Sequence, residues 1–313
     1  MTLVINKNNH TRDIAHDKTS QAIFLFGVPR SGTFILGKII HSFKNVECTF
    51  EPPTLLSLFS LINKIDESSW KLLFETHLFE DFFMNALAGR SINCNRIDDS
   101  SVYHSKEEGE IEKRLTSTFR ETTLQEICKN GIIACKLSFI SPELLKLKKW
   151  YPNLRVLSSL REAEDVISSY LVKDWYSDKN FQRNSFVKPH ILKNNYCIPF
   201  WIPEVDYDLW INFSQIEKIA YDYIYMSRQI KKSDNNVIWY SDLVNKPKKT
   251  IQRLSKSMKV DWGTKTEGLV STISRKTNRT SRTILNNVSI ELREELNYWN
   301  DFNKSRGSYF TNE

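Results

Sequence analysis

Short apolar runs alternate with amphipathic stretches along most of the chain. Four runs have the length and the ending of buried strands: 22–28 (AIFLFGV), 131–139 (GIIACKLSF), 154–160 (LRVLSSL) and 236–240 (NVIWY). Apolar residues at helical spacing follow at 31–43, 53–87, 142–151, 162–175, 207–230, 247–258 and 289–302. Strands that alternate with helices predict an α/β fold with a central parallel β-sheet flanked by helices.

The other segments are polar or irregular. Residues 1–20 are predicted to form a polar N-terminal arm, and 21–313 a single domain. Residues 91–110 and 262–287 are predicted as loops, and 176–204 as irregular and rich in aromatic residues. Ligands of such folds bind beyond the carboxyl ends of the strands, so residues at those ends are the candidates for a site.

Composition narrows the class of protein. Hydrophobic residues make up 40% and charged residues 26%, as in ordinary globular proteins, and the net charge of +7 suits an anionic ligand without implying nucleic acid. Five cysteines without C-x-x-C spacing favour buried thiols in a reducing compartment. No signal peptide and no run of about 18 apolar residues is found, so we expect a cytoplasmic protein without a membrane partner.

The first predicted strand leads into GVPRSGT (27–33), which is almost a phosphate-binding loop. Gly27 and Gly32 keep the spacing of G-x-x-x-x-G-K-[ST], but Thr33 and Phe34 stand where the lysine and the magnesium-binding hydroxyl belong. Backbone N–H groups and a helix N-terminus can still bind one phosphate, and Arg30 adds a guanidinium. The loop therefore predicts phosphate chemistry without a triphosphate or a metal; an ordinary turn with an exposed arginine is the alternative.

This loop resembles the 5′-phosphosulfate loop of sulfotransferases that use 3′-phosphoadenosine-5′-phosphosulfate (PAPS). LREAEDVISSY (160–170) has the family's spacing of an arginine and a serine, Arg161 and Ser169, on the 3′-phosphate. WYSDLVNKPKKTIQRL (239–254) is similar to a late strand–turn–helix segment of the family. The likeness is to Golgi-type and bacterial members with PRSGT, including tyrosylprotein sulfotransferases. It implies a P-loop NTPase-like sulfotransferase fold and sulfuryl transfer from PAPS to an acceptor, with release of 3′,5′-ADP (PAP). The lack of a signal peptide and of a membrane anchor favours a hydroxyl or amine of a cytoplasmic small molecule as the acceptor.

The resemblance also implies roles for single residues. Glu51 aligns with the catalytic base, and Lys136 with Arg30 would stabilise the transferred group; His104 is the reserve candidate for the base. This chain has Ser138 where a proline is common, and Phe34 where a second threonine is frequent. The resemblance assigns the donor to the loop, to Arg161 and Ser169, and to a late basic loop: Pro29, Arg30, Ser31, Gly32, Thr33, Phe34, Arg161, Ser169, Arg275, Lys276, Arg279, with Arg282 beside them.

PFWIPEVDYDLW (199–210) interleaves aromatic and acidic residues. Aromatic faces with carboxylates suit a cationic acceptor, whose candidate contacts are Trp201, Glu204, Tyr207, Asp208 and Trp210. Acids in the first turn of a helix are the alternative explanation. Glycans and peptide tyrosines also stay open as acceptors. A P-loop kinase and a nucleotide- or RNA-binding module are the alternatives of a different class; they predict magnesium-dependent ATP binding and salt-sensitive polyanion binding respectively.

Overall fold

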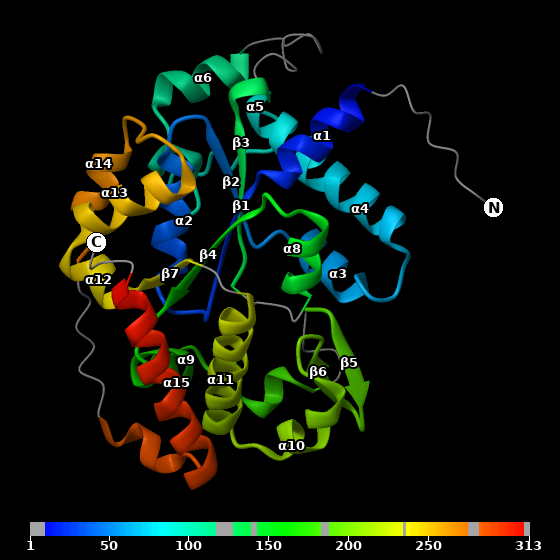
Figure 1. Ribbon diagram of the computed structural model, residues 1–313, viewed down its shortest axis with the longest axis vertical. Coiled ribbons are helices and arrows are strands. Elements are labelled where there is room, and N and C mark those ends of the chain that lie inside the picture. Colours follow the sequence, from blue (N-terminus) through cyan, green and yellow to red (C-terminus); the bar gives the residue numbers. More distant parts are fainter. Residues whose placement is uncertain are drawn as a thin grey trace.

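The centre of the molecule is a five-stranded sheet with all strands parallel (Figure 1). The computed structural model describes residues 10–116, 128–138, 143–182, 188–233, 236–274 and 282–309. The strand order is β2-β3-β1-β4-β7. The bounds are β1 Ile23–Gly27, β2 Val46–Phe50, β3 Ile132–Lys136, β4 Arg155–Leu160 and β7 Asn236–Trp239. The predicted α/β class and the four predicted strands are confirmed.

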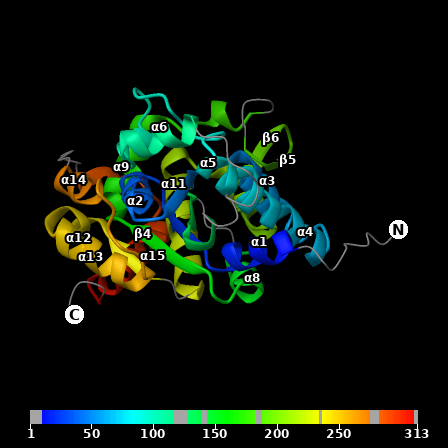
Figure 2. The ribbon, with the colours of Figure 1, turned by 90° about the horizontal axis from the view of Figure 1, so that it is seen from above.

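Helices cover both faces of the sheet, because side chains alternate along each strand. Ile23 and Leu25 of β1 face one layer of helices, and Phe24 and Phe26 face the other. The first layer holds α2 (Thr33–Ser42), α12 (Tyr240–Asn245), α13 (Pro247–Met258) and α14 (Thr266–Ser271). The second holds α3 (Pro53–Leu61), α4 (Glu67–Glu75), the π-helix η1 (Thr76–Met84), α5 (Asn85–Leu87), α8 (Leu144–Trp150), α9 (Ala163–Lys173), α11 (Gln215–Ser233) and α15 (Ile290–Tyr309). Figure 2 shows α13 and α14 on the opposite side of the sheet from α3 and α4.

Several segments differ from the predicted elements, and strand β2 was not predicted. Residues His10–Ser20 form helix α1, whose Ala15 and Thr19 are buried, so this part of the expected polar arm packs on the domain. The predicted loops contain the short helices η2 (Val102–His104) and α14, and helix α6 (Glu108–Thr116) begins within 91–110. The stretch 176–204 contains η3 (Asp178–Asn180) and an antiparallel hairpin of β5 (His190–Lys193) and β6 (Tyr196–Pro199). Its turn residues Asn194 and Asn195 both have positive φ, as a two-residue hairpin turn requires.

The helix predicted over 207–230 is two helices, α10 (Tyr207–Asn212) and α11. Helix α11 begins directly after Ser214, whose hydroxyl accepts a hydrogen bond from the N–H of Glu217. The Glu217 carboxylate in turn accepts from the backbone N–H of Ser214 over 3.0 Å. This reciprocal pair is a capping box, which begins α11 in place of a continuous helix.

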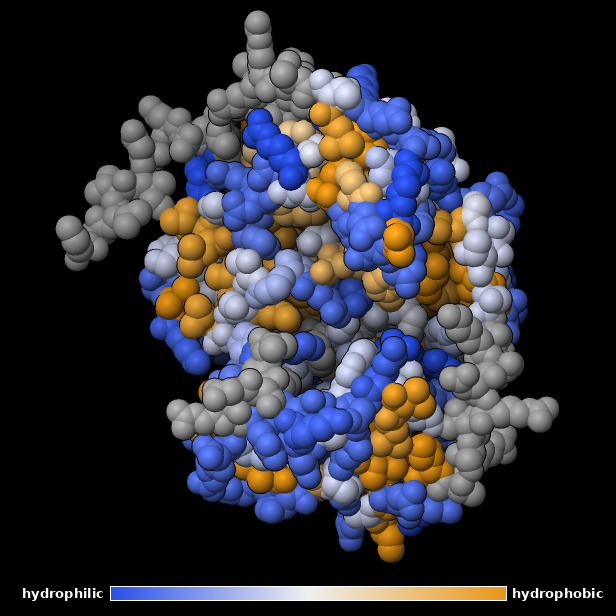
Figure 3. Space-filling view, turned by 180° about the vertical axis from the view of Figure 1, so that it is seen from behind, coloured by the Kyte–Doolittle hydropathy of each residue, from blue (hydrophilic) through white to orange (hydrophobic). Residues whose placement is uncertain are grey.

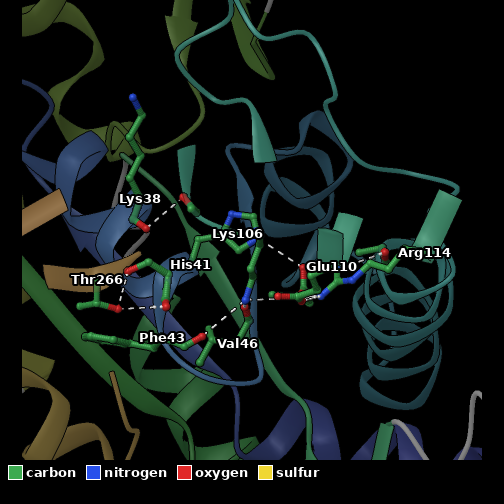
Figure 4. Close-up of polar contacts among 12 residues, drawn as sticks. Lys38, His41, Phe43, Val46, Lys106, Glu110, Arg114 and Thr266 are labelled. Carbon is green, nitrogen blue, oxygen red and sulfur yellow. Dashed lines mark hydrogen bonds and ion pairs between the residues drawn. The ribbon is translucent and has the colours of Figure 1, made fainter. Parts of the chain in front are cut away.

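Strand β2 carries a buried carboxylate, Glu47, which three cationic or titratable side chains surround. Figure 4 labels these three side chains, His41, Lys106 and Arg114. Its oxygens lie 2.7 Å from Arg114 Nη2, 3.5 Å from Lys106 Nζ and 3.2 Å from His41 Nε2. Burial raises the pKa of Glu47, but Lys106, His41 and Arg114 outweigh it and hold that pKa well below its ordinary value. Lys106 also donates to the carbonyl of Val46. The cluster fixes α6 and the segment before it to the edge of the sheet.

Among the described residues, no helix combines the length and the apolar character needed to cross a membrane.

Candidate functional site

A cavity of about 1150 Å³ lies at the carboxyl ends of the sheet strands. Each of the five strands ends in or next to residues that line it: Arg30 after β1, Phe50 and Glu51 at β2, Lys136 at β3, Arg161 after β4 and Tyr240 after β7. The loop, Lys136 and Arg161 therefore share one rim, as expected. Figure 3 shows the rear face hollowed at mid-height, where hydrophilic and hydrophobic residues meet.

The loop after β1 is a tight turn that only glycine permits at two positions. A Cβ added at Gly27 would lie 2.4 Å from the carbonyl oxygen of Ser159 on the neighbouring strand. Gly32 has φ 83°, and an added Cβ would lie 2.7 Å from the Tyr240 ring. Helix α2 begins directly after Gly32, at Thr33. The turn thus brings the N-terminus of α2 to the cavity, where its unpaired N–H groups can meet an anion.

Arg30 points across the cavity to helix α9. It has a positive φ of 73°, and its Nε donates to Ser169 Oγ over 2.8 Å. Its guanidinium carbon lies 5.7 Å from the centroid of the Trp175 ring. A strained backbone at an arginine fits a residue whose side chain must be aimed, at a cost of about 1–3 kcal/mol.

Arg161 joins the same group. Its Nη1 donates to the carbonyl of Arg30 over 3.4 Å, and its guanidinium carbon lies 4.5 Å from the Tyr240 ring centroid. Nε and Nη2 both donate to Asp165 Oδ2, over 3.0 and 2.8 Å. Arg161 is therefore ion-paired with Asp165, and both residues line the cavity together with Arg30 and Ser169.

Glu51 and Lys136 line the cavity side by side. Phe50 and Lys136 are partners in the β2–β3 register, so Glu51 follows β2 at the level of Lys136. Lys136 Nζ donates to Glu51 Oε1 over 2.6 Å and to Ser138 Oγ over 2.8 Å, and Ser138 donates to the same carboxylate oxygen. The Lys136 side chain is 7% exposed and that of Glu51 is 38% exposed. The lysine is thus held by its partners, while the carboxylate faces the open cavity.

Ser138, at the position where the sulfotransferases that the sequence resembles commonly have a proline, takes part in this network. Phe34 gives the cavity an apolar surface in place of a hydroxyl. The centroids of the Phe34 and Phe50 rings lie 5.4 Å apart. Pro29, Gly32 and Thr33 line the cavity as well. Ser31 is fully buried behind the loop, where its carbonyl accepts from Ser159 Oγ.

Of the five residues predicted for the acceptor, one lines the cavity. Trp201 is buried in the wall, and its Nε1 donates to Asp222 Oδ1 over 3.0 Å. The other four are outside the lining: Glu204 begins the short helix η4 (Glu204–Asp206), Tyr207 is half-buried at the start of α10, Asp208 pairs with Lys193, and Trp210 is buried edge-on against Phe181. Their positions give no support to acceptor contacts.

The remaining predicted residues lie elsewhere. His104 donates through Nε2 to the backbone carbonyl of Asp98 and is not part of the cavity lining. Arg275, Lys276 and Arg279 lie outside the described residues, and so does the side chain of Arg282. Within the described ranges, no three His, Cys, Asp or Glu side chains gather into a candidate metal site.

Three cavity features were missed by sequence reasoning. Asp98 and Asp99 line one wall, and Lys188 lines another. Asp222 lies behind the wall on α11 and accepts hydrogen bonds from Tyr176 and Trp201. Burial raises the pKa of Asp222 to about 6. None of these residues stands at a predicted strand end, so no local pattern in the sequence marks them.

Of three comparisons with known proteins, only the one with solved structures finds similar chains. No family model matches the chain, and no curated protein does. The chain is similar to the sulfotransferase domain from the curacin biosynthetic pathway, at 13% identity and TM-score 0.44, over 78% of this chain and 76% of that one. It is also similar to the sulfotransferase domain of the Synechococcus PCC 7002 olefin synthase, at 13% identity and TM-score 0.44, over 93% and 94%. A sulfotransferase from Alicyclobacillus acidocaldarius has 13% identity and TM-score 0.40, over 92% and 94%.

Proposed function

We propose that the protein is a sulfotransferase that moves a sulfuryl group from PAPS to a hydroxyl or amine of a small molecule. One observation carries the proposal: a phosphate loop without the lysine shares a cavity with Arg161, Ser169 and the Glu51–Lys136 pair. Two separate phosphate positions, with a carboxylate beside them, suit a donor that has a phosphate at each end of its ribose.

The donor would lie across the loop. The N–H groups at the start of α2 would bind the 5′ side, and Arg161 with Ser169 the 3′-phosphate, because guanidinium and hydroxyl groups are strong phosphate partners. The Arg30 side chain donates to Ser169, and the Arg30 carbonyl accepts from Arg161, which supports a shared role of the three residues. The late basic residues Arg275, Lys276 and Arg279 stay part of this proposal.

In the transfer step, the acceptor oxygen or nitrogen bonds to sulfur while the bond from sulfur to the phosphate oxygen breaks. The acceptor proton passes to Glu51, and 3′,5′-ADP leaves with the bonding electron pair. The contacts of Glu51 within the described residues use Oε1, so Oε2 is the oxygen offered to the acceptor. Lys136 and Arg30 would neutralise charge that develops on the sulfuryl oxygens. The chain's own cations supply this charge, and the proposal includes no metal.

The alternatives fit the cavity less well. Thr33 stands where a kinase needs the lysine that reaches the β- and γ-phosphates. A nucleic-acid-binding module has no need of the Glu51 carboxylate, which is hydrogen-bonded to Lys136. A volume of about 1150 Å³ is enough for a nucleotide and a small acceptor together, which favours a small molecule over a glycan chain or peptide. All five cysteines are unpaired, which suits the reducing cytoplasm that we propose.

Calorimetry tests the donor assignment. In the absence of magnesium, 3′,5′-ADP should bind at least about tenfold more tightly than 5′-AMP, because the second phosphate gains charge-assisted hydrogen bonds. ATP with magnesium is the control for the kinase alternative. Equal affinity for 3′,5′-ADP and 5′-AMP contradicts the 3′-phosphate site. A screen of acceptors with labelled PAPS then tests sulfuryl transfer itself.

A further inference from the structure

One cation in the cavity has no part in the proposed donor site. Lys188 precedes the β5–β6 hairpin and lines the cavity with Glu51, Lys136 and Trp201. Its Nζ lies 5.7 Å from the centroid of the Trp201 ring. Burial lowers the pKa of Lys188 to about 8, and the carboxylates of Glu51 and Asp222 oppose that shift. At neutral pH the side chain is therefore mostly an ammonium ion.

The two carboxylates near Lys188 are bound by other donors. Glu51 Oε1 accepts from Lys136 and Ser138, and the two oxygens of Asp222 accept from Tyr176 and from Trp201 Nε1. An ammonium group carries three N–H donors, so Lys188 can bind a ligand in addition to its contacts within the protein. A ligand carboxylate at this position would receive a charge-assisted hydrogen bond in a half-buried site, where such bonds are stronger than in water.

Aromatic rings also line this cavity. Trp175, Tyr176, Phe181 and Trp201 all contribute to its lining. The Trp201 indole is held in place by its hydrogen bond to Asp222, and the Tyr176 hydroxyl by its bond to the same carboxylate. These walls suit a flat apolar body, with a charged group beyond it at Lys188.

We propose, on the basis of the sulfotransferase function above, that the acceptor is an aromatic hydroxy compound with a carboxylate. The carboxylate binds Lys188, the ring lies against the aromatic wall that includes Trp201, and the hydroxyl faces Glu51. This is the opposite charge from the one that the acids of 204–208 suggested. Those acids lie outside the cavity lining, whereas Lys188 lies within it.

Three probes of matched shape test the proposal: 4-hydroxyphenylacetate, its neutral amide 4-hydroxyphenylacetamide, and the cation tyramine. Their dissociation constants are measured by calorimetry, with and without saturating 3′,5′-ADP. We expect the acid to bind at least about tenfold more tightly than the amide, and tyramine to bind most weakly. A preference for the amide or the amine, or no binding of the acid at millimolar concentration, overturns the proposal.

Substitutions test whether Lys188 causes the preference for the acid. Lys188→Met should bring the acid and the amide to within about twofold of each other, while the affinity for 3′,5′-ADP stays unchanged. Lys188→Gln, which keeps a polar end, should also lose the preference for the acid over the amide. Agreement between the two variants shows that the charge of Lys188, and not its packing, causes the preference. Lys193→Met is the matched control, because Lys193 pairs with Asp208 outside the cavity lining. A preference that survives both changes at Lys188 contradicts the assignment.

The donor and acceptor proposals can fail separately. If the unmodified protein does not bind 3′,5′-ADP, the sulfotransferase proposal fails, and the charge preference is still measured on the protein without nucleotide. If 3′,5′-ADP binds but the acid shows no preference that depends on Lys188, only the acceptor proposal fails.

Discussion

Lys136 Nζ donates a hydrogen bond to Glu51 Oε1 over 2.6 Å, and this bond joins the carboxyl ends of the adjacent strands β2 and β3. The backbone repeats the link, because the N–H of Glu51 donates to the Lys136 carbonyl over 2.8 Å. Glu51 also has a positive φ of 48°, so its side chain is directed by a bend that these contacts hold in place. A carboxylate fixed in this way is suited to receive a proton from a bound acceptor.

Glu51→Gln should lower turnover by about 100-fold or more, because the amide keeps the shape of the side chain and removes its basicity. The affinity for 3′,5′-ADP, measured by calorimetry, should change little. Glu204→Gln is the control, since Glu204 lies outside the cavity lining. If Glu51→Gln turns over at the normal rate, the base lies elsewhere and His104 is the next residue to substitute.

Arg161→Ala should weaken 3′,5′-ADP binding by about 2 kcal/mol, the scale for loss of a charged hydrogen-bond partner. Binding of 5′-AMP should change much less, because it has no 3′-phosphate. The comparison of the two nucleotides separates a lost phosphate contact from a general disturbance of the loop, and an equal loss for both would point to the latter.

Glu47→Gln should destabilise the protein by about 3–5 kcal/mol, because it leaves buried Lys106 and Arg114 without their carboxylate. Glu110→Gln is a matched control: Glu110 also pairs with Arg114, but its side chain is 46% exposed. We expect less than about 1 kcal/mol there. Denaturant unfolding followed by circular dichroism measures both, and equal losses would contradict the role of burial.

Stability should fall as the pH drops below 6.5, the ordinary pKa of histidine, partly through His41. Burial lowers the pKa of folded His41, so the unfolded chain binds a proton that the folded protein excludes. His41→Gln should therefore flatten the fall of unfolding free energy between pH 6.5 and 5 by up to about 1.4 kcal/mol per pH unit. His77, whose pKa burial also lowers, keeps part of the slope. An unchanged slope in the variant excludes His41 as a contributor.

Local sequence patterns predict the strands that are buried on both faces, because those strands read as continuous apolar runs. Strand β2 was missed because Glu47 interrupts its pattern, and only the distant residues Lys106 and Arg114 make that charge acceptable inside the protein. The division between α10 and α11 was marked in the sequence by Ser214 and Glu217, a capping signal that the apolar spacing outweighed.

Some residues of the candidate site could be predicted from the sequence, and others could not. Arg30, Lys136 and Arg161 stand at strand ends, where a parallel sheet gathers side chains from distant segments, so they could be assigned from sequence. Lys188 comes from an irregular stretch, and only tertiary packing brings it to Glu51. The acids near residue 206 lie at a helix start with Tyr207, and their position outside the cavity lining depends on how that short helix packs.

In the proposed donor site, Asp165 competes with the 3′-phosphate for Arg161. Three of the five N–H donors of Arg161 are engaged within the described residues, two of them by Asp165. A bound phosphate must share the guanidinium of Arg161 with the Asp165 carboxylate or displace that carboxylate. When the phosphate leaves, Asp165 can form its hydrogen bonds to Arg161 again. Under the proposed function, this competition would weaken the binding of 3′,5′-ADP and speed its dissociation, as an enzyme that releases a charged product in every cycle requires.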